Sequence, residues 1–104
     1  MSASVSRETG PDRFEVSADG VVAGFAQFVD HDGRRVFFHT EVGEEFGGHG
    51  LAGIVVEEAV RATREEGLTV VPVCPYVKKW LTKHPEHADI SEAPTPADLA
   101  AIDG

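Results

Sequence analysis

A glycine-dense loop, GGHGLAG at residues 47–53, is the stretch of the sequence best suited to hold a charged ligand. Its spacing contains the G-x-G-x-x-G pattern of dinucleotide-binding loops. Because residues 47, 48 and 50 carry no side chain, the backbone N–H groups at the start of a following helix stay uncovered, and with the helix dipole they favour an anion. The alternative is that the glycines only form a tight turn between a strand and a helix.

A nicotinamide dinucleotide does not fit the context of this loop. A dinucleotide fold needs an acidic residue about 20 positions further on and a second half of parallel sheet. The segment at that place reads LTVVPVCP and has no carboxylate, and a chain of 104 residues is too short for two half-sheets. A phosphate held by the backbone and a plain turn remain as the two interpretations.

Three side chains outside the loop could do nucleophilic or acid-base chemistry. Cys74 is the only cysteine, so it forms no internal disulfide, and it is either a nucleophile or an inert buried residue. His39 and Glu41 alternate along a predicted strand, so both lie on one face, opposite Thr40 and Val42. One of them could relay a proton; the alternative for His39 is a half-buried sheet residue with a satisfied ring.

The pattern around these residues predicts three antiparallel strands, a helix, a further strand and a short helix. Asp-Gly pairs at 19–20 and 32–33 supply turns between the first strands, and Gly67 is placed to end the first helix. The run LTVVPV is apolar without alternation, so we expect a strand that is buried on both faces and central in the sheet. The predicted strands are 14–17, 21–29, 35–42 and 68–73, and the predicted helices are 51–66 and 76–83.

The two ends of the chain differ from this folded part in composition. Residues 1–12 are polar and are expected to be a flexible start, residues 13–88 the folded domain, and residues 89–104 a loosely attached acidic tail. Within the tail, Thr95-Pro96-x-Asp98 could start one helical turn.

Charge and composition limit the function classes. The formal net charge of −9 disfavours nucleic acid and anionic membranes as partners, because both need a positive surface. No charged-then-apolar leader or long apolar run marks secretion or a membrane span, so the cytoplasm is the expected compartment. The five histidines and the one cysteine lack the spacing of a metal site.

Three short motifs in this order resemble the GNAT superfamily of acyl-CoA-dependent N-acyltransferases, and more narrowly its short, single-domain branch. Gly50 and Ala52 match the superfamily loop Arg/Gln-x-x-Gly-x-Gly/Ala, and the short branch shares H-T-E-V at 39–42 and Cys-Pro-aromatic-Val at 74–77, followed by H-P-E. The similarity covers roughly residues 14–87. It implies an α/β (α+β) GNAT-like fold with a three-stranded antiparallel N-terminal part, a central helix, a buried strand and a short C-terminal helix.

The resemblance implies a binding site for acetyl-CoA. Val42 would pair its backbone with the pantetheine arm, which would pass between splayed strands and bring the acyl thioester beside Cys74. Gly47 stands where the superfamily has Arg or Gln, so the backbone alone would hold the pyrophosphate, with Gly48 letting it approach. The implied N–H donors are those of His49, Gly50, Leu51 and Ala52.

The resemblance also assigns roles on the last helix. The tyrosine that acts as the acid in many relatives corresponds here to Trp80-Leu81, which cannot release a proton. Tyr76, one turn earlier, is a possible substitute or else a core residue. Lys78 and Lys79, with Lys83, form the only basic cluster, which either holds the 3′-phosphate of coenzyme A or is a solvated face.

The implied function is an N-acetyltransferase that moves an acetyl group from acetyl-CoA to a primary amine of a small molecule or peptide. The alternative is a non-catalytic coenzyme A-binding or protein-interaction module, because the short branch lacks the helices that build the acceptor site in full-length members. Covalent catalysis by Cys74 and a mere lining role both stay open. The expected oligomeric state is a monomer or a weak dimer.

Overall fold

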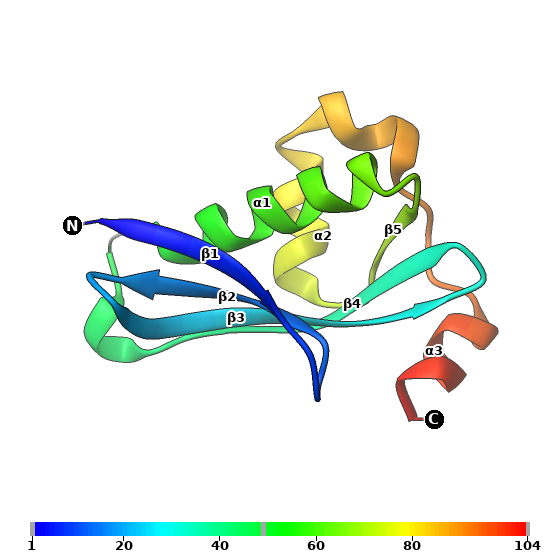
Figure 1. Ribbon diagram of the computed structural model, residues 1–104. Coiled ribbons are helices and arrows are strands. Elements are labelled where there is room, and N and C mark those ends of the chain that lie inside the picture. Colours follow the sequence, from blue (N-terminus) through cyan, green and yellow to red (C-terminus); the bar gives the residue numbers. More distant parts are fainter. Residues whose placement is uncertain (1, 49, 104) are drawn as a thin grey trace.

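The computed structural model describes residues 2–48 and 50–103, so the prediction for His49 lies outside the described residues. Five strands form one sheet in the order β1-β2-β3-β4-β5, with α1 and α2 packed on one side and α3 on the other (Figure 1). The first four strands are antiparallel to their neighbours, and β5 is parallel to β4. The elements are β1 (Ala3–Glu8), β2 (Arg13–Ala18), β3 (Val21–His31), β4 (Arg34–Val42), η1 (Glu44–Phe46), α1 (Leu51–Glu65), β5 (Thr69–Pro72), α2 (Pro75–Thr82), η2 (Pro85–Ile90) and α3 (Pro96–Asp103).

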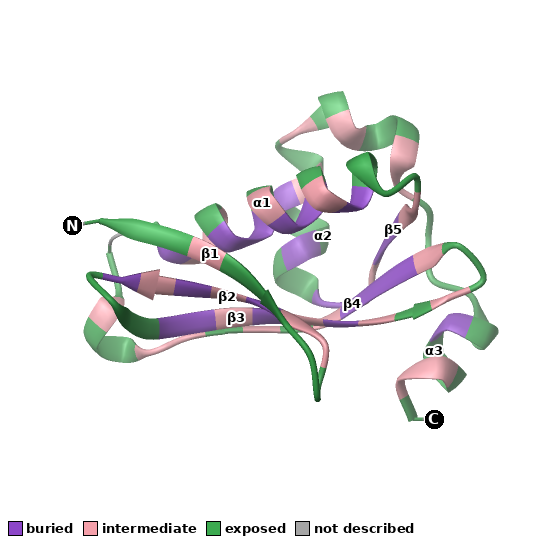
Figure 2. Ribbon diagram, viewed as in Figure 1, coloured by how far each residue is buried: buried purple, intermediate pink, exposed green. Residues whose placement is uncertain are grey.

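The main core lies between the sheet and the two helices α1 and α2 (Figure 2). Alternation along β2 buries Phe14 and Val16 on this face, and apolar residues at helical spacing give α1 one buried stripe. Val77 and Trp80 extend the core from α2. The predicted α/β order of three strands, helix, strand and helix is confirmed by β2 to β4, α1, β5 and α2. None of the described helices is long and apolar enough to cross a membrane.

The apolar strand after α1 is not central in the sheet, so that prediction is wrong. Strand β5 pairs with β4 only, and it ends the sheet order. Its burial was predicted correctly, since Val70 and Val71 are both fully buried. An apolar run reports burial of both faces and not the number of neighbouring strands. The outer edge of β5 is met instead by a short bridge to Ser91 and by the Glu92 N–H, which donates to the Val70 carbonyl at 3.0 Å.

The polar start of the chain contains strand β1, whereas the sequence favoured a flexible segment. Val5 is the one residue of β1 that is even half-buried, so the strand has no apolar alternation to reveal it. Backbone pairing with β2 and a long-range ion pair hold it instead. Arg7 Nη1 lies 2.8 Å from Glu66 Oε1, and Glu66 follows directly after α1.

Glu66 belongs to a network around a fully buried arginine. Arg35 donates Nε and Nη2 to the carboxylate of Asp30 at 2.8 and 2.9 Å, and Nη2 and Nη1 to that of Glu66 at 2.8 and 3.0 Å. Its guanidinium also lies over the Phe28 ring, 4.6 Å from the centroid. Hydrogen bonds from Arg35, and then from Arg7, lower the pKa of Glu66 to about 2. The network joins β1, β3, β4 and the end of α1.

The C-terminal segment is tied to the sheet, whereas the sequence favoured a loose tail. Asp98 is fully buried and accepts two hydrogen bonds from Arg34, both at 2.9 Å, and lies 2.6 Å from His31 Nε2. The pKa of Asp98 is held well below its usual range, chiefly by Arg34. Thr95 and Asp98 cap the start of α3 reciprocally at 2.8 and 3.2 Å, which confirms the predicted helical start there.

Candidate active site

The candidate site begins where strands β4 and β5 part. They pair from Arg34–Thr69 to Phe37–Pro72, and the Phe37 carbonyl then accepts the N–H groups of both Val73 and Cys74, at 3.0 and 2.9 Å. Beyond this point the chain after Cys74 turns into α2, while β4 continues to Val42. Within the described residues, the stretch of β4 from 38 to 42 therefore has no strand partner on the β5 side, and the two strands part there.

The glycine loop reaches α1 in a conformation that glycine favours. Gly48 and Gly50 have φ angles of 84° and 70°, in the left-handed region, and a Cβ on either one would meet nothing within 4 Å. Gly50 caps α1 without a side-chain hydrogen bond, and the first turn holds no acidic residue. The first intrahelical bond runs from Ile54 to Gly50, at 3.2 Å. Within residues 2–48 and 50–103, no group accepts a hydrogen bond from the amides of Leu51, Ala52 and Gly53. These donors and the free space at Gly48 and Gly50 fit a phosphate.

Acidic residues precede this helix start and oppose an anion. Glu44 and Glu45 lie exposed in η1, between the end of β4 and the glycine loop. A chain with a net charge of −9 has no general attraction for phosphates. Any binding here has to come from the local backbone donors, as expected from the glycine at position 47.

Tyr76 connects α2 to the start of α1. It is 40% exposed, so it is not a core residue, and a methyl group on Gly53 would meet its hydroxyl at 3.8 Å. Lys79 follows one turn later on the same side of α2. Lys78 lies on another side, where it lines a separate groove of about 360 Å³ with Pro72 and Leu81. Of Lys78 and Lys79, for which the resemblance left open a phosphate role or a solvated face, Lys79 shares the Tyr76 face and Lys78 does not.

Cys74 lies where the two strands part, as a buried thiol. It is 5% exposed, and its Sγ donates to Thr40 Oγ1 at 3.5 Å, so the contact bridges the two parting strands. Sequence reasoning missed Thr40 as the partner of Cys74. Alternation groups Thr40 with Val42, but the register shift between the Phe28–Phe37 and Gln27–His39 pairs turns this group to the helix side, where Val42 packs against the core.

His39 and Glu41 lie on the opposite face of β4, as the alternation predicts. His39 Nε2 is 3.3 Å from Glu41 Oε1, and the two side chains are 50% and 64% exposed. The His39 ring packs on Phe25, with the ring centroids 5.7 Å apart. His39 is thus an exposed residue and not a half-buried one. The structure brings together His39 with Glu41 and Cys74 with Thr40, but it places these pairs on different sides of β4.

The whole arrangement corresponds to an acetyltransferase fold of the GCN5 type. The solution structure of a GCN5-like putative N-acetyltransferase from Staphylococcus aureus superposes with a TM-score of 0.66 at 20% identity, over 89% of this chain and 91% of that one. The crystal structure of a ribosomal-protein-alanine N-acetyltransferase from Brucella melitensis biovar Abortus 2308 gives a TM-score of 0.56 at 21% identity, over 81% of this chain and 63% of that one. These identities show likeness of fold alone.

The family follows from a sequence model. The model of the GCN5-related N-acetyl-transferase family matches residues 13–90, so the chain belongs to this family. The matched range includes both parting strands, the glycine loop and α2. Among curated proteins, none matches the chain.

Proposed function

We propose that the protein binds acetyl-CoA where β4 and β5 part and transfers the acetyl group to a primary amine. One observation carries this proposal. The uncapped, glycine-bounded start of α1 lies next to the strands that part after Phe37–Pro72, as the Tyr76 hydroxyl beside Gly53 indicates. The proposed phosphate site and the unpaired edge of β4 are therefore neighbours.

Backbone groups do most of the binding in this proposal. The N–H groups of Gly50, Leu51 and Ala52 hold the pyrophosphate, and the same role for His49 stays a prediction. The free edge of β4 near Val42 pairs with the pantetheine arm, and Lys79 lies within the part of α2 that serves the 3′-phosphate. Bound acetyl-CoA supplies an acetyl thioester, whose C–S bond breaks as the C–N bond to the amine forms.

The two proton transfers of the reaction are assigned to residues on opposite sides of β4. An incoming ammonium has to lose a proton before it can attack, and the thiolate has to gain one. His39 and Glu41 are exposed on the open face, where they accept the proton of the ammonium. Tyr76, on the helix side, returns a proton to the thiolate. Cys74 lines the path of the pantetheine arm, because its thiol is buried and bonded to Thr40 and no cation contacts it among the described residues.

Titration of acetyl-CoA into isotope-labelled protein tests the binding step. We expect the amide signals of Gly50, Leu51 and Ala52 to shift, and signals of α3 to stay in place as an internal control. Unchanged signals at Gly50–Ala52 in millimolar acetyl-CoA would overturn the proposal. Mass spectrometry after the same incubation tests the lining role of Cys74, since an acetylated Cys74 would show covalent catalysis instead.

One observation favours a second candidate, a coenzyme A-binding module without transferase activity. The buried thiol and the exposed His39–Glu41 pair face different sides of β4, so no compact catalytic group is assembled. Release of free thiol from acetyl-CoA, measured over a panel of amines and peptides, separates the two candidates. Saturable binding without thiol release for any amine in the panel would favour the module.

A further inference from the structure

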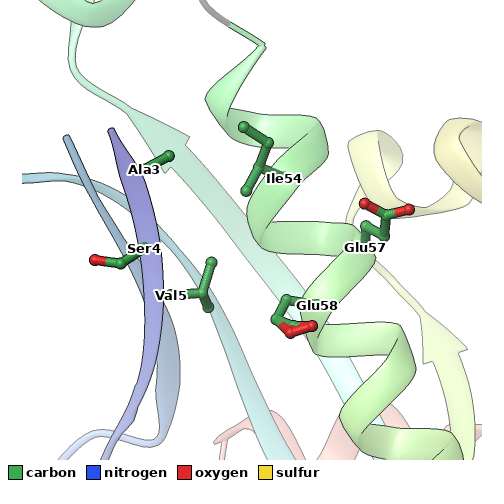
Figure 3. A pocket seen from close by; sticks show the side chains of 6 residues that line it. All are labelled: Ala3, Ser4, Val5, Ile54, Glu57 and Glu58. Atoms are coloured by element: carbon green, nitrogen blue, oxygen red, sulfur yellow. The ribbon is translucent and has the colours of Figure 1, made fainter. Parts of the chain in front are cut away.

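A shallow groove of about 230 Å³ lies between strand β1 and helix α1, away from the point where β4 and β5 part (Figure 3). Ala3 and Val5 point from the strand toward the helix, whereas Ser4 points away from it. Ile54 and Glu58 lie on the side of α1 that faces the strand. Since Ile54 is 37% exposed, the groove offers open apolar surface as well as carboxylates.

The backbone on the outer side of this groove is available for pairing. Strand β1 ends the sheet and, within the described residues, pairs with β2 alone. The Asp19 N–H donates to the Ser2 carbonyl at 2.8 Å, so Ser2 faces β2. In an antiparallel ladder the direction alternates, so the backbone groups of Ala3, Val5 and Arg7 point outward. No proline interrupts β1, and an edge of this kind is a template for a further strand.

The charge of the groove indicates the kind of segment that fits. Its charged lining residues are Glu57 and Glu58. Glu58 is paired with Arg61 at 2.8 Å, and among the described residues no cation forms an ion pair with Glu57. A second copy of this chain would bring the same two carboxylates toward these, within a molecule of net charge −9. A basic partner gains from this field and a second copy does not.

We propose that the groove between β1 and α1 binds an extended basic peptide segment, which adds to the sheet as a strand beside β1. The main chain of the segment pairs with Ala3, Val5 and Arg7. Every second side chain of the segment faces α1, where Lys or Arg meets Glu57 and Glu58 and an apolar residue contacts Ile54. Backbone bonds supply affinity and the alternate side chains supply selectivity. This interaction does not depend on acetyl transfer.

The first test uses a capped peptide of alternating arginine and threonine, titrated at low salt into labelled protein. Arginine is chosen because a guanidinium is not a primary amine and cannot act as an acetyl acceptor. We expect shifts at Ala3, Val5, Arg7 and along the first turns of α1. The double variant Glu57→Gln/Glu58→Gln should bind at least about fivefold more weakly. The matched double variant Glu44→Gln/Glu45→Gln, with the same change of charge, should bind as the parent does.

A second pair of variants tests the edge itself. Val5→Pro removes an outward N–H without removing a bond to β2, so peptide binding should be lost while the β2 and β3 amide signals persist. Val5→Thr keeps the N–H and should retain binding. Equal binding of a peptide with its arginines in one block would overturn strand addition in favour of simple charge attraction. Absence of binding would overturn the proposal, as would a dimer in light scattering that Val5→Pro dissociates.

Discussion

The two ends of helix α1 differ in how their polar groups are paired. At its start, Gly50 leaves the first amides without a side-chain cap and without an acidic neighbour in the first turn. At its end, Glu66 is bound by Arg35 and Arg7 in a network that reaches three strands. The first end is open where a ligand is proposed, and the second is saturated with ion pairs.

This difference has an energetic meaning. A glycine cap such as Gly50 gives up roughly a few tenths of a kcal/mol of helix stability relative to a Ser, Thr, Asp or Asn cap. The core contacts of α1 and the ion pairs at its end offset that loss, so the start can be kept free for a phosphate. The comparison predicts that changes at the end of α1 act on stability, whereas changes at its start act on ligand binding.

Replacement of Arg35 should have the largest effect on stability. Arg35→Met keeps apolar bulk but leaves Asp30 and Glu66 with Arg7 as their shared cation. Because both carboxylates are more than a third exposed, we expect a cost of about 1–3 kcal/mol, below that of a fully buried pair. We expect the free energy of unfolding in urea to fall by that amount. The affinity of the folded variant for acetyl-CoA should stay close to that of the parent. Arg61→Met is the matched control, because Arg61 is 59% exposed and its ion pair is worth less than about 1 kcal/mol. Equal losses in the two variants would contradict the role given to the network.

Substitution at Gly50 should show the reverse pattern. Gly50→Ala places a Cβ on a left-handed residue, which costs about 1–2 kcal/mol and pushes the helix start toward another conformation. The affinity for acetyl-CoA, measured by calorimetry, should fall about tenfold, whereas Gly20→Ala, also left-handed but in the β2–β3 turn, should leave it unchanged. If Gly50→Ala binds as the parent does, the start of α1 is not the phosphate site.

Local sequence patterns predicted the elements that alternate or repeat, and they failed where long-range ion pairs decide. Alternation and the Asp-Gly pairs gave β2, β3 and β4, and helical spacing gave α1. Strand β1 depends on Arg7 and Glu66, 59 positions apart, and α3 on Arg34 and Asp98, 64 positions apart. No short stretch of sequence contains both partners of such a pair. Polar segments that these pairs hold in place therefore look flexible in the sequence.

The candidate site was predictable to a similar degree. The glycine loop and the shared face of His39 and Glu41 follow from spacing alone. The contact between Cys74 and Thr40 depends on where β5 stops pairing with β4, which no pattern in either strand specifies. Lys78 and Lys79 were grouped as one basic cluster, although consecutive residues of the predicted helix do not share a side; what the sequence did not show is that Lys78 lines a groove with Pro72 and Leu81.

Acid should lower the free energy of unfolding by protonating Glu66 at the end of α1. The pKa of Glu66 is about 2 in the folded protein, lowered from 4.5, so its contribution to stability is complete above about pH 4.5 and is lost as the pH falls toward 2. Urea midpoints at pH 7, 4 and 3 should therefore decline more steeply for the parent than for Glu66→Gln, which has no carboxylate to protonate. Parallel declines would show that Glu66 does not contribute to acid sensitivity.

The smallest effect is expected from the two carboxylates before the glycine loop. Glu44 and Glu45 are exposed, so their repulsion of a bound phosphate acts through water and is worth only a few tenths of a kcal/mol each. Glu44→Gln/Glu45→Gln should therefore raise the affinity for acetyl-CoA about two- to threefold at low salt, and the gain should fade at 0.5 M salt because the charges are screened. Glu86→Gln with Glu92→Gln makes the same change of charge away from the start of α1 and should give no gain. An equal gain from that control would mean that net charge, and not the open start of α1, sets the affinity.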